Sequence, residues 1–135
     1  MSDLLQARIL LEAAHRDLKA LGGMSDSEIF EDEIFGVHVQ QAAEKSLKAW
    51  LALLGEIYPY THNLTRLFKK LKDLNCNVSK YTDLAIFSAF AEQIRYVGMS
   101  SEEPPIEREH RINQVNSLYN HVNDLLNSST ARNSS

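Results

Sequence analysis

The sequence lacks several features that would place it in a special class of protein. Cys76 is the only cysteine in 135 residues, so one subunit can form neither a disulfide framework nor a zinc site made of cysteines. No apolar run approaches the roughly 20 residues that a membrane-spanning helix needs, and no basic stretch near Met1 leads into an apolar signal segment. These absences predict a soluble, cytoplasmic protein that does not associate with a membrane.

An excess of positive charge is also missing. Fourteen basic residues stand against 18 acidic ones, which gives a formal net charge of -4. A protein that wraps nucleic acid without sequence preference neutralises many phosphates with lysine and arginine. The charge balance therefore argues against such a protein, although a small local cluster of basic residues could still hold a few phosphates.

What the sequence does have is a recurrence of apolar residues every three or four positions, the spacing of one helical face. Gly22, Gly55 and Gly98 lie near the ends of such segments, where glycine commonly terminates a helix. The pattern predicts helices at about residues 3–21, 29–54, 64–74 and 79–96, and a last helix that begins at Pro104–Pro105 and runs through Leu126.

No segment alternates apolar and polar residues with the period of a strand, and no internal repeat is present. Amphipathic helices joined by short connections bury their apolar faces in a bundle. We therefore expect an all-α fold, an antiparallel up-and-down bundle of four longer helices plus one short helix. Residues 1–127 form a single domain in this interpretation, and residues 128–135 form a polar, frayed tail.

The segment 29–54 carries polar residues on two different sides. At 100° per residue, Gln40 falls within the arc of apolar residues that faces the core, and its amide is either satisfied by a nearby backbone group or lines a ligand groove. Gln41, Glu44 and Lys48 fall on the opposite side. Glu44 and Lys48 then form either an exposed ion pair worth about 0.3–0.5 kcal/mol or part of an interface with a subunit or partner.

Three arginines are candidates for binding phosphate. Arg95 lies at the end of one predicted helix, and Arg108 and Arg111 lie at the start of the next, so neighbouring helices would bring them to one end of the bundle. Guanidinium groups bind phosphate oxygens bidentately. The alternative is that they pair with nearby carboxylates, namely Glu102, Glu103, Glu107 and Glu109.

Three motifs together resemble the HEPN family of helical domains: QQAAEKSLKA at residues 40–49, Thr61-His62-Asn63-Leu64, and Arg95-Tyr96. The resemblance extends from Leu4 to Leu126. It implies a helical bundle that often forms homodimers and often pairs with a minimal nucleotidyltransferase in toxin-antitoxin or stress systems. It also implies a nucleotide-binding groove, for which the candidate residues are Gln40, His62, Arg95, Tyr96, Arg108 and Arg111.

Family members that cleave RNA carry an arginine followed, after four to six residues, by a histidine that acts as general acid or base. The next histidine after Arg95 is His110, so this pair is missing from the expected place. Only Arg8 and His15, on the first helix, have the required interval, and they are the catalytic candidates.

These observations predict a module that binds a nucleotide or a nucleotidyltransferase partner, without nuclease activity, metal or cofactor. The alternatives are a metal-independent endoribonuclease toxin acting on RNA and a purely structural interaction domain.

Overall fold

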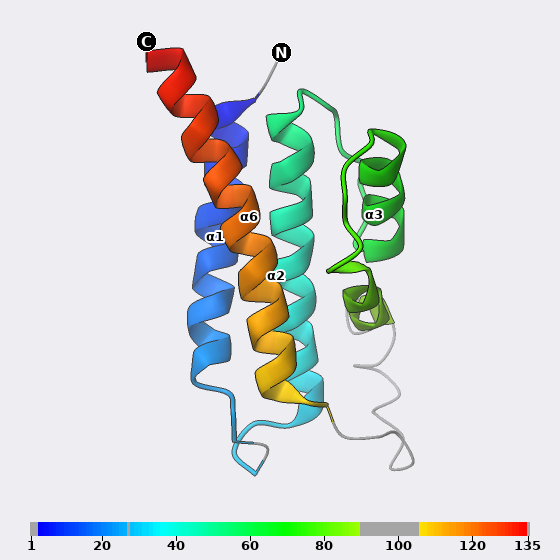
Figure 1. Ribbon diagram of the computed structural model, residues 1–135. Helices are drawn as coiled ribbons and strands as arrows, with labels where there is room; N and C mark the ends of the chain where they lie inside the picture. The colour runs from blue at the N-terminus through cyan, green and yellow to red at the C-terminus, as the bar shows by residue number, and fades with distance from the viewer. Residues whose placement is uncertain (1–2, 27, 90–105, 135) are drawn as a thin grey trace.

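The computed structural model describes residues 3–26, 28–89 and 106–134 (Figure 1). Every regular element in these residues is a helix, which confirms the predicted all-α bundle. No helix in the described part of the chain is long and apolar enough to cross a membrane. The elements are α1 (Leu4–Gly22), α2 (Asp32–Leu53), α3 (Leu64–Asp73), the 3-10 helix η1 (Thr82–Phe87) and α6 (Arg108–Ser134).

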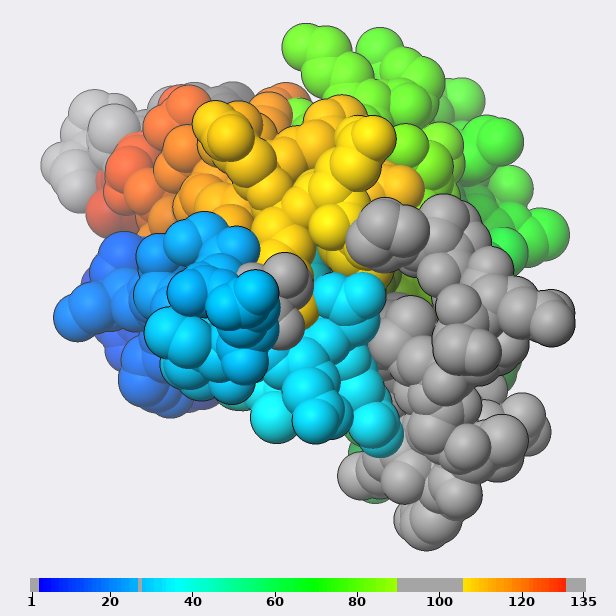
Figure 2. Space-filling model, turned by 90° about the horizontal axis from the view of Figure 1, so that it is seen from below, coloured from blue at the N-terminus to red at the C-terminus, as the bar shows by residue number. Residues whose placement is uncertain are grey.

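The helices α1, α2 and α6 lie side by side, and α3 and η1 pack on another side of α2 (Figure 1). Figure 2 looks onto the end of the bundle where α1 ends and where α2 and α6 begin. The start of α6 lies against the connection between α1 and α2. The helix α1 therefore runs opposite to both α2 and α6.

The boundaries of the first two helices follow from local hydrogen bonds. Asp3 caps α1, because its carboxylate accepts from the backbone N–H of Gln6 at 3.0 Å. The helix α2 begins at Asp32, later than expected. The N–H groups of Ile29 and Phe30 both turn back to the carbonyl of Asp26, at 3.2 and 3.0 Å, and form a separate turn before the helix.

The later boundaries differ more from the prediction. Residues Thr82–Phe87 form the 3-10 helix η1 where the start of a longer α-helix was expected. Ser88 and Ala89 continue as helix, and residues 90–96 of the expected helix lie outside the described residues. The prolines at 104 and 105 also lie outside them, and α6 is described from Arg108. It continues to Ser134, so the polar composition after Leu126 does not end the helix as expected.

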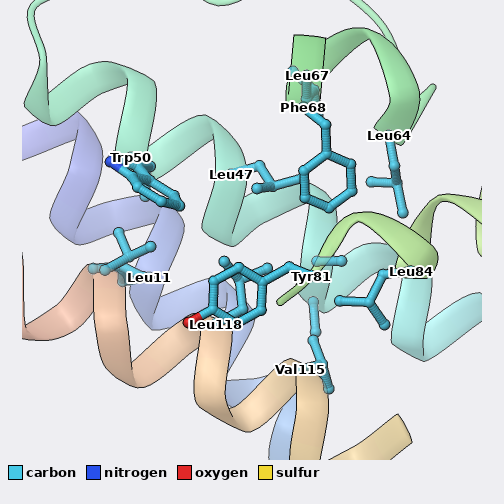
Figure 3. Packing of buried hydrophobic residues seen from close by; sticks show 14 of the residues in the cluster. Leu11, Leu47, Trp50, Leu64, Leu67, Phe68, Tyr81, Leu84, Val115 and Leu118 are labelled. Carbon is cyan, nitrogen blue, oxygen red and sulfur yellow. The ribbon is translucent and has the colours of Figure 1, made fainter. Parts of the chain in front are cut away.

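The apolar core lies between all five elements. Figure 3 shows Leu11 of α1, Trp50 of α2 and Leu118 of α6 pointing into it, with Phe68 of α3 packed from the other side. Fifteen of the 22 residues of α2 are buried, so this helix is covered over most of its circumference and is the central helix of the bundle, as predicted.

Candidate functional site

A stripe of polar residues runs along α2 and is buried. Gln40, Glu44 and Lys48 follow one another at intervals of four, so their side chains lie above one another on one side of the helix. The exposed fraction is 0% for Gln40, 6% for Glu44 and 9% for Lys48. The expectations that Glu44 and Lys48 lie opposite Gln40 on the helix and that they form an exposed pair are therefore both wrong.

The cause of this burial is the connection between α2 and α3, residues 54–63. The chain turns at Gly55, whose φ of 77° suits glycine, and then runs back along α2. Tyr58 comes to lie beside Lys48, and His62 comes to lie beside Glu44. The connection thus covers the side of α2 that a helical projection alone places in solvent.

Glu44 is the centre of the polar contacts. Its Oε1 accepts from the Gln40 amide at 2.7 Å and contacts Nδ1 of His62 at 2.8 Å. Its Oε2 accepts from the Lys48 ammonium at 3.1 Å. A buried carboxylate is tolerated only when it is paired and hydrogen-bonded, and both oxygens of Glu44 meet that condition.

Gln40 is fully satisfied by protein groups. Besides its bond to Glu44, its amide nitrogen donates to the backbone carbonyl of His62 at 3.1 Å, and its oxygen accepts from the Gln41 amide at 2.7 Å. The side chain therefore fastens the connection to α2. This corresponds to the structural interpretation of Gln40, in which a backbone group satisfies the buried amide.

His62 is the part of this cluster that reaches solvent. Its side chain is 59% exposed, whereas that of Glu44 is 8% exposed. Because an ionised carboxylate only accepts hydrogen bonds, the contact with Glu44 assigns a proton to Nδ1 of His62. Within the described residues, no hydrogen bond involves Nε2. A histidine oriented in this way by a carboxylate can hydrogen-bond a phosphate or hydroxyl group, or transfer a proton. We call Gln40, Glu44, Lys48 and His62 the Glu44 cluster.

Arg108 lies elsewhere and binds protein acceptors. Its guanidinium donates to the carbonyls of Met24 at 2.7 Å and Phe30 at 2.5 Å, and to the Asp32 carboxylate at 2.8 Å. It also lies over the ring of Phe35, 4.9 Å from its centroid. Arg108 is 6% exposed and fastens the connection between α1 and α2 to the start of α6.

Arg111 is directed to a different segment. It forms an ion pair with Asp83 at 3.3 Å, donates to Gln114 at 2.8 Å and lies 5.4 Å from the centroid of the Phe87 ring. It holds η1 against α6. The structure therefore does not bring Arg108 and Arg111 to a shared phosphate site, because Arg108 binds the connection between α1 and α2 whereas Arg111 binds η1. Within the described residues their carboxylate partners are Asp32 and Asp83 rather than Glu107 or Glu109, and Glu102 and Glu103 lie outside those residues.

The remaining candidates are placed as follows. Arg8 and His15 are both exposed on α1. His15 lies beside Tyr119 of α6, with ring centroids 5.8 Å apart. Burial, followed by the nearby charge of Glu12, raises the pKa of Tyr119 above its ordinary value. Arg95 and Tyr96 lie outside the described residues.

Sequence reasoning missed Tyr58 and Asp17. The Tyr58 ring lies 5.5 Å from the Lys48 ammonium, and its hydroxyl accepts from Gln6 at 2.8 Å. Asp17 of α1 accepts from Lys45 at 2.7 Å and contacts His38 at 3.1 Å. The spacing of Gln40, Glu44 and Lys48 was a usable signal for a polar stripe, but no such signal exists for these contacts between distant segments.

Fold and site together define an all-α domain whose central helix carries a buried polar cluster that ends at an exposed histidine. The model of the HEPN domain family matches residues 7–128 of the chain. The protein belongs to the HEPN family, and membership supports a nucleotide-related or ribonuclease-like module in general. No curated protein and no solved structure matches the chain.

Proposed function

We propose that this HEPN protein is a nucleotide-binding module that does not cleave RNA, and that His62 contacts the ligand. The observation that carries the proposal is the 2.8 Å contact between Nδ1 of His62 and the buried Glu44 carboxylate. It fixes the ring while most of the side chain stays exposed. A histidine prepared in this way loses little conformational freedom when it binds a phosphate or ribose hydroxyl.

Arg95 and Tyr96 belong to the same proposal. Arg108 and Arg111 are engaged with protein acceptors, so Arg95 is the predicted arginine that would supply positive charge to the ligand phosphates. The proposed absence of cleavage rests on the sequence, in which no histidine follows Arg95 at the interval found in the nucleases of the family.

Isothermal titration calorimetry of the full chain with the common ribonucleoside triphosphates tests this function. We expect binding to the unmodified protein and its loss in His62→Ala. His110→Ala is the matched control, because His110 is an exposed histidine on α6. Absence of binding to every triphosphate, or equal binding by His62→Ala and the unmodified protein, would refute the proposal.

A metal-independent ribonuclease is the second candidate, and the same contact favours it. A histidine oriented by a carboxylate is an arrangement that general acid–base catalysis uses. Incubation of RNA with the purified protein, with His62→Ala and with the Arg95→Ala and His15→Ala variants separates the two functions. Cleavage that is lost in His62→Ala supports the ribonuclease, and intact RNA in every reaction supports the binding module.

We also propose that the protein forms a homodimer and pairs with a minimal nucleotidyltransferase in a toxin-antitoxin or stress system. Of the predicted interface residues, Glu44 and Lys48 are buried within the subunit, while Gln41 is partly exposed beside them. Sedimentation of the purified protein tests the dimer. Copurification with the product of a neighbouring nucleotidyltransferase gene tests the partner, and its absence from the purified complex counts against it.

A further inference from the structure

The positive charge of this acidic protein is concentrated on α3. The ten residues Leu64–Asp73 contain four cations, Arg66, Lys69, Lys70 and Lys72, and one carboxylate. The apolar residues of the helix are buried against α2 and η1, which leaves the cations on the outward side. Figure 1 shows α3 at the edge of the molecule, with α2 between it and α1.

A groove lies between α3 and the connection that follows α2. Its volume is about 540 Å³, and it is lined by apolar and basic side chains and one carboxylate: Ile57, Tyr58, Pro59, Arg66, Lys69, Lys70, Asp73 and Leu74. Beside it the connection exposes Tyr60 completely and Ile57 to 88%. A groove with apolar walls, basic residues along one side and an exposed aromatic ring nearby fits a ligand with flat bases and phosphates.

The cations of the groove are available to such a ligand. Within the described residues, no hydrogen bond or ion pair involves the guanidinium of Arg66. Lys69 pairs with Asp73 at 3.2 Å, but their side chains are 77% and 66% exposed, and such a pair contributes little. Lys70 donates one hydrogen bond to the carbonyl of Ile57 and lies 4.0 Å from Glu56. Asp73 and Glu56 therefore offset only half of the charge of the four cations.

We propose that α3 and residues 57–60 form a binding surface for a single-stranded nucleic acid. Arg66, Lys69 and Lys70 contact successive phosphates, and a base stacks on the exposed ring of Tyr60. A single strand fits better than a duplex, because stacking on a side chain needs an unpaired base. The acidic character of the rest of the chain repels phosphates and confines the strand to α3.

Fluorescence anisotropy of a labelled oligouridine with the full chain tests this surface. In Arg66→Gln/Lys69→Gln we expect the affinity to fall at least about tenfold. The slope of log affinity against log salt concentration should become less steep by about 1.4, the change expected when two phosphate contacts are lost. The matched control is Arg16→Gln/Lys19→Gln, which changes the same residue types at the same spacing on exposed positions of α1. No binding by the unmodified protein, or equal losses in both double variants, would overturn the proposal.

Two variants of Tyr60 test the stacking contact. Tyr60→Phe keeps the ring and should bind normally, whereas Tyr60→Leu should lose at least about fivefold. Equal binding by both variants, or tighter binding of duplex RNA of the same length, overturns the assignment to a single strand.

His62 is not among the residues that line the groove, so we treat the surface and the proposed nucleotide site as separate, and the two proposals can fail independently. We expect His62→Ala to bind oligouridine normally and Arg66→Gln/Lys69→Gln to keep its affinity for mononucleotides. Loss of oligouridine binding in His62→Ala would contradict a separate surface.

Discussion

Two buried charges in this molecule hold connections against helices, but their surroundings differ. Arg108 and Glu44 are each 6% exposed. The hydrogen bonds of Arg108 end on Met24, Phe30 and Asp32, which belong to the segment between α1 and the first residue of α2. The contacts of Glu44 lead instead to His62, whose side chain is 59% exposed. Both buried charges contribute to stability, and Glu44 also contacts a largely exposed histidine, which is why the ligand contact is proposed there.

The first way to test this comparison is Arg108→Met, for which we expect the largest loss of stability. The change leaves the carbonyls of Met24 and Phe30 and the Asp32 carboxylate without their donor, and removing one member of a buried charged network costs about 3 kcal/mol or more. Urea unfolding measures the loss. Nucleotide binding should stay unchanged wherever the variant is folded.

Arg111→Met is the control for this prediction. Its ion-pair partner Asp83 has a side chain that is 60% exposed, so water can replace the lost contact and the expected loss is about 1 kcal/mol. Equal free energies of unfolding for the two variants would contradict the structural role assigned to Arg108.

The second test is Glu44→Leu, which leaves the Lys48 ammonium buried without its partner and His62 without its orienting carboxylate. We expect a loss of about 2–3 kcal/mol in urea unfolding, together with the loss of nucleotide binding. The double variant Glu44→Leu/Lys48→Met removes the unpaired charge and should recover part of the stability without recovering binding. Recovery of binding in the double variant would show that Glu44 does not position His62.

The same comparison shows what the sequence could predict. Periodicity was sufficient for the helical bundle, for the extent of α1 and for the central position of α2. It placed Glu44 and Lys48 opposite Gln40, although four residues at 100° each separate Gln40 from Glu44 by only about 40°. The expected exposure also failed because the connection containing Tyr58 and His62 folds back over that side, and the period of one helix contains no information about a later segment.

The arginines of α6 illustrate a second limit. The acceptors of Arg108 include backbone carbonyls of Met24 and Phe30, and every residue carries a carbonyl, so no residue type marks such a partner in a sequence. The different partners of Arg108 and Arg111 depend on which distant segments pack beside each of them at the start of α6. Arg95 and Tyr96 lie outside the described residues, and their place in the nucleotide site stays a prediction.

The third test is His62→Ala, which separates binding from stability at the exposed end of the Glu44 cluster. The lost contact to Glu44 involves a side chain that is 59% exposed, and Glu44 keeps its bonds to Gln40 and Lys48. We therefore expect a loss of about 1 kcal/mol or less in urea unfolding, while calorimetry shows that nucleotide binding is lost. A large loss of stability would instead make His62 a structural residue like Arg108.

The smallest expected effect on stability belongs to Asp73→Asn, which extends the comparison to an ion pair that is exposed on both sides. The pair of Asp73 with Lys69 contributes less than about 0.5 kcal/mol, so urea unfolding should barely change. The change removes a negative charge from the groove beside α3, and oligouridine should bind about two- to fivefold more tightly at low salt, with the difference shrinking as salt is added. Weaker binding of oligouridine by Asp73→Asn would mean that Asp73 orients Lys69 for the ligand. The pair would then resemble Glu44 and His62, in which an acidic residue is proposed to orient a neighbouring side chain for binding.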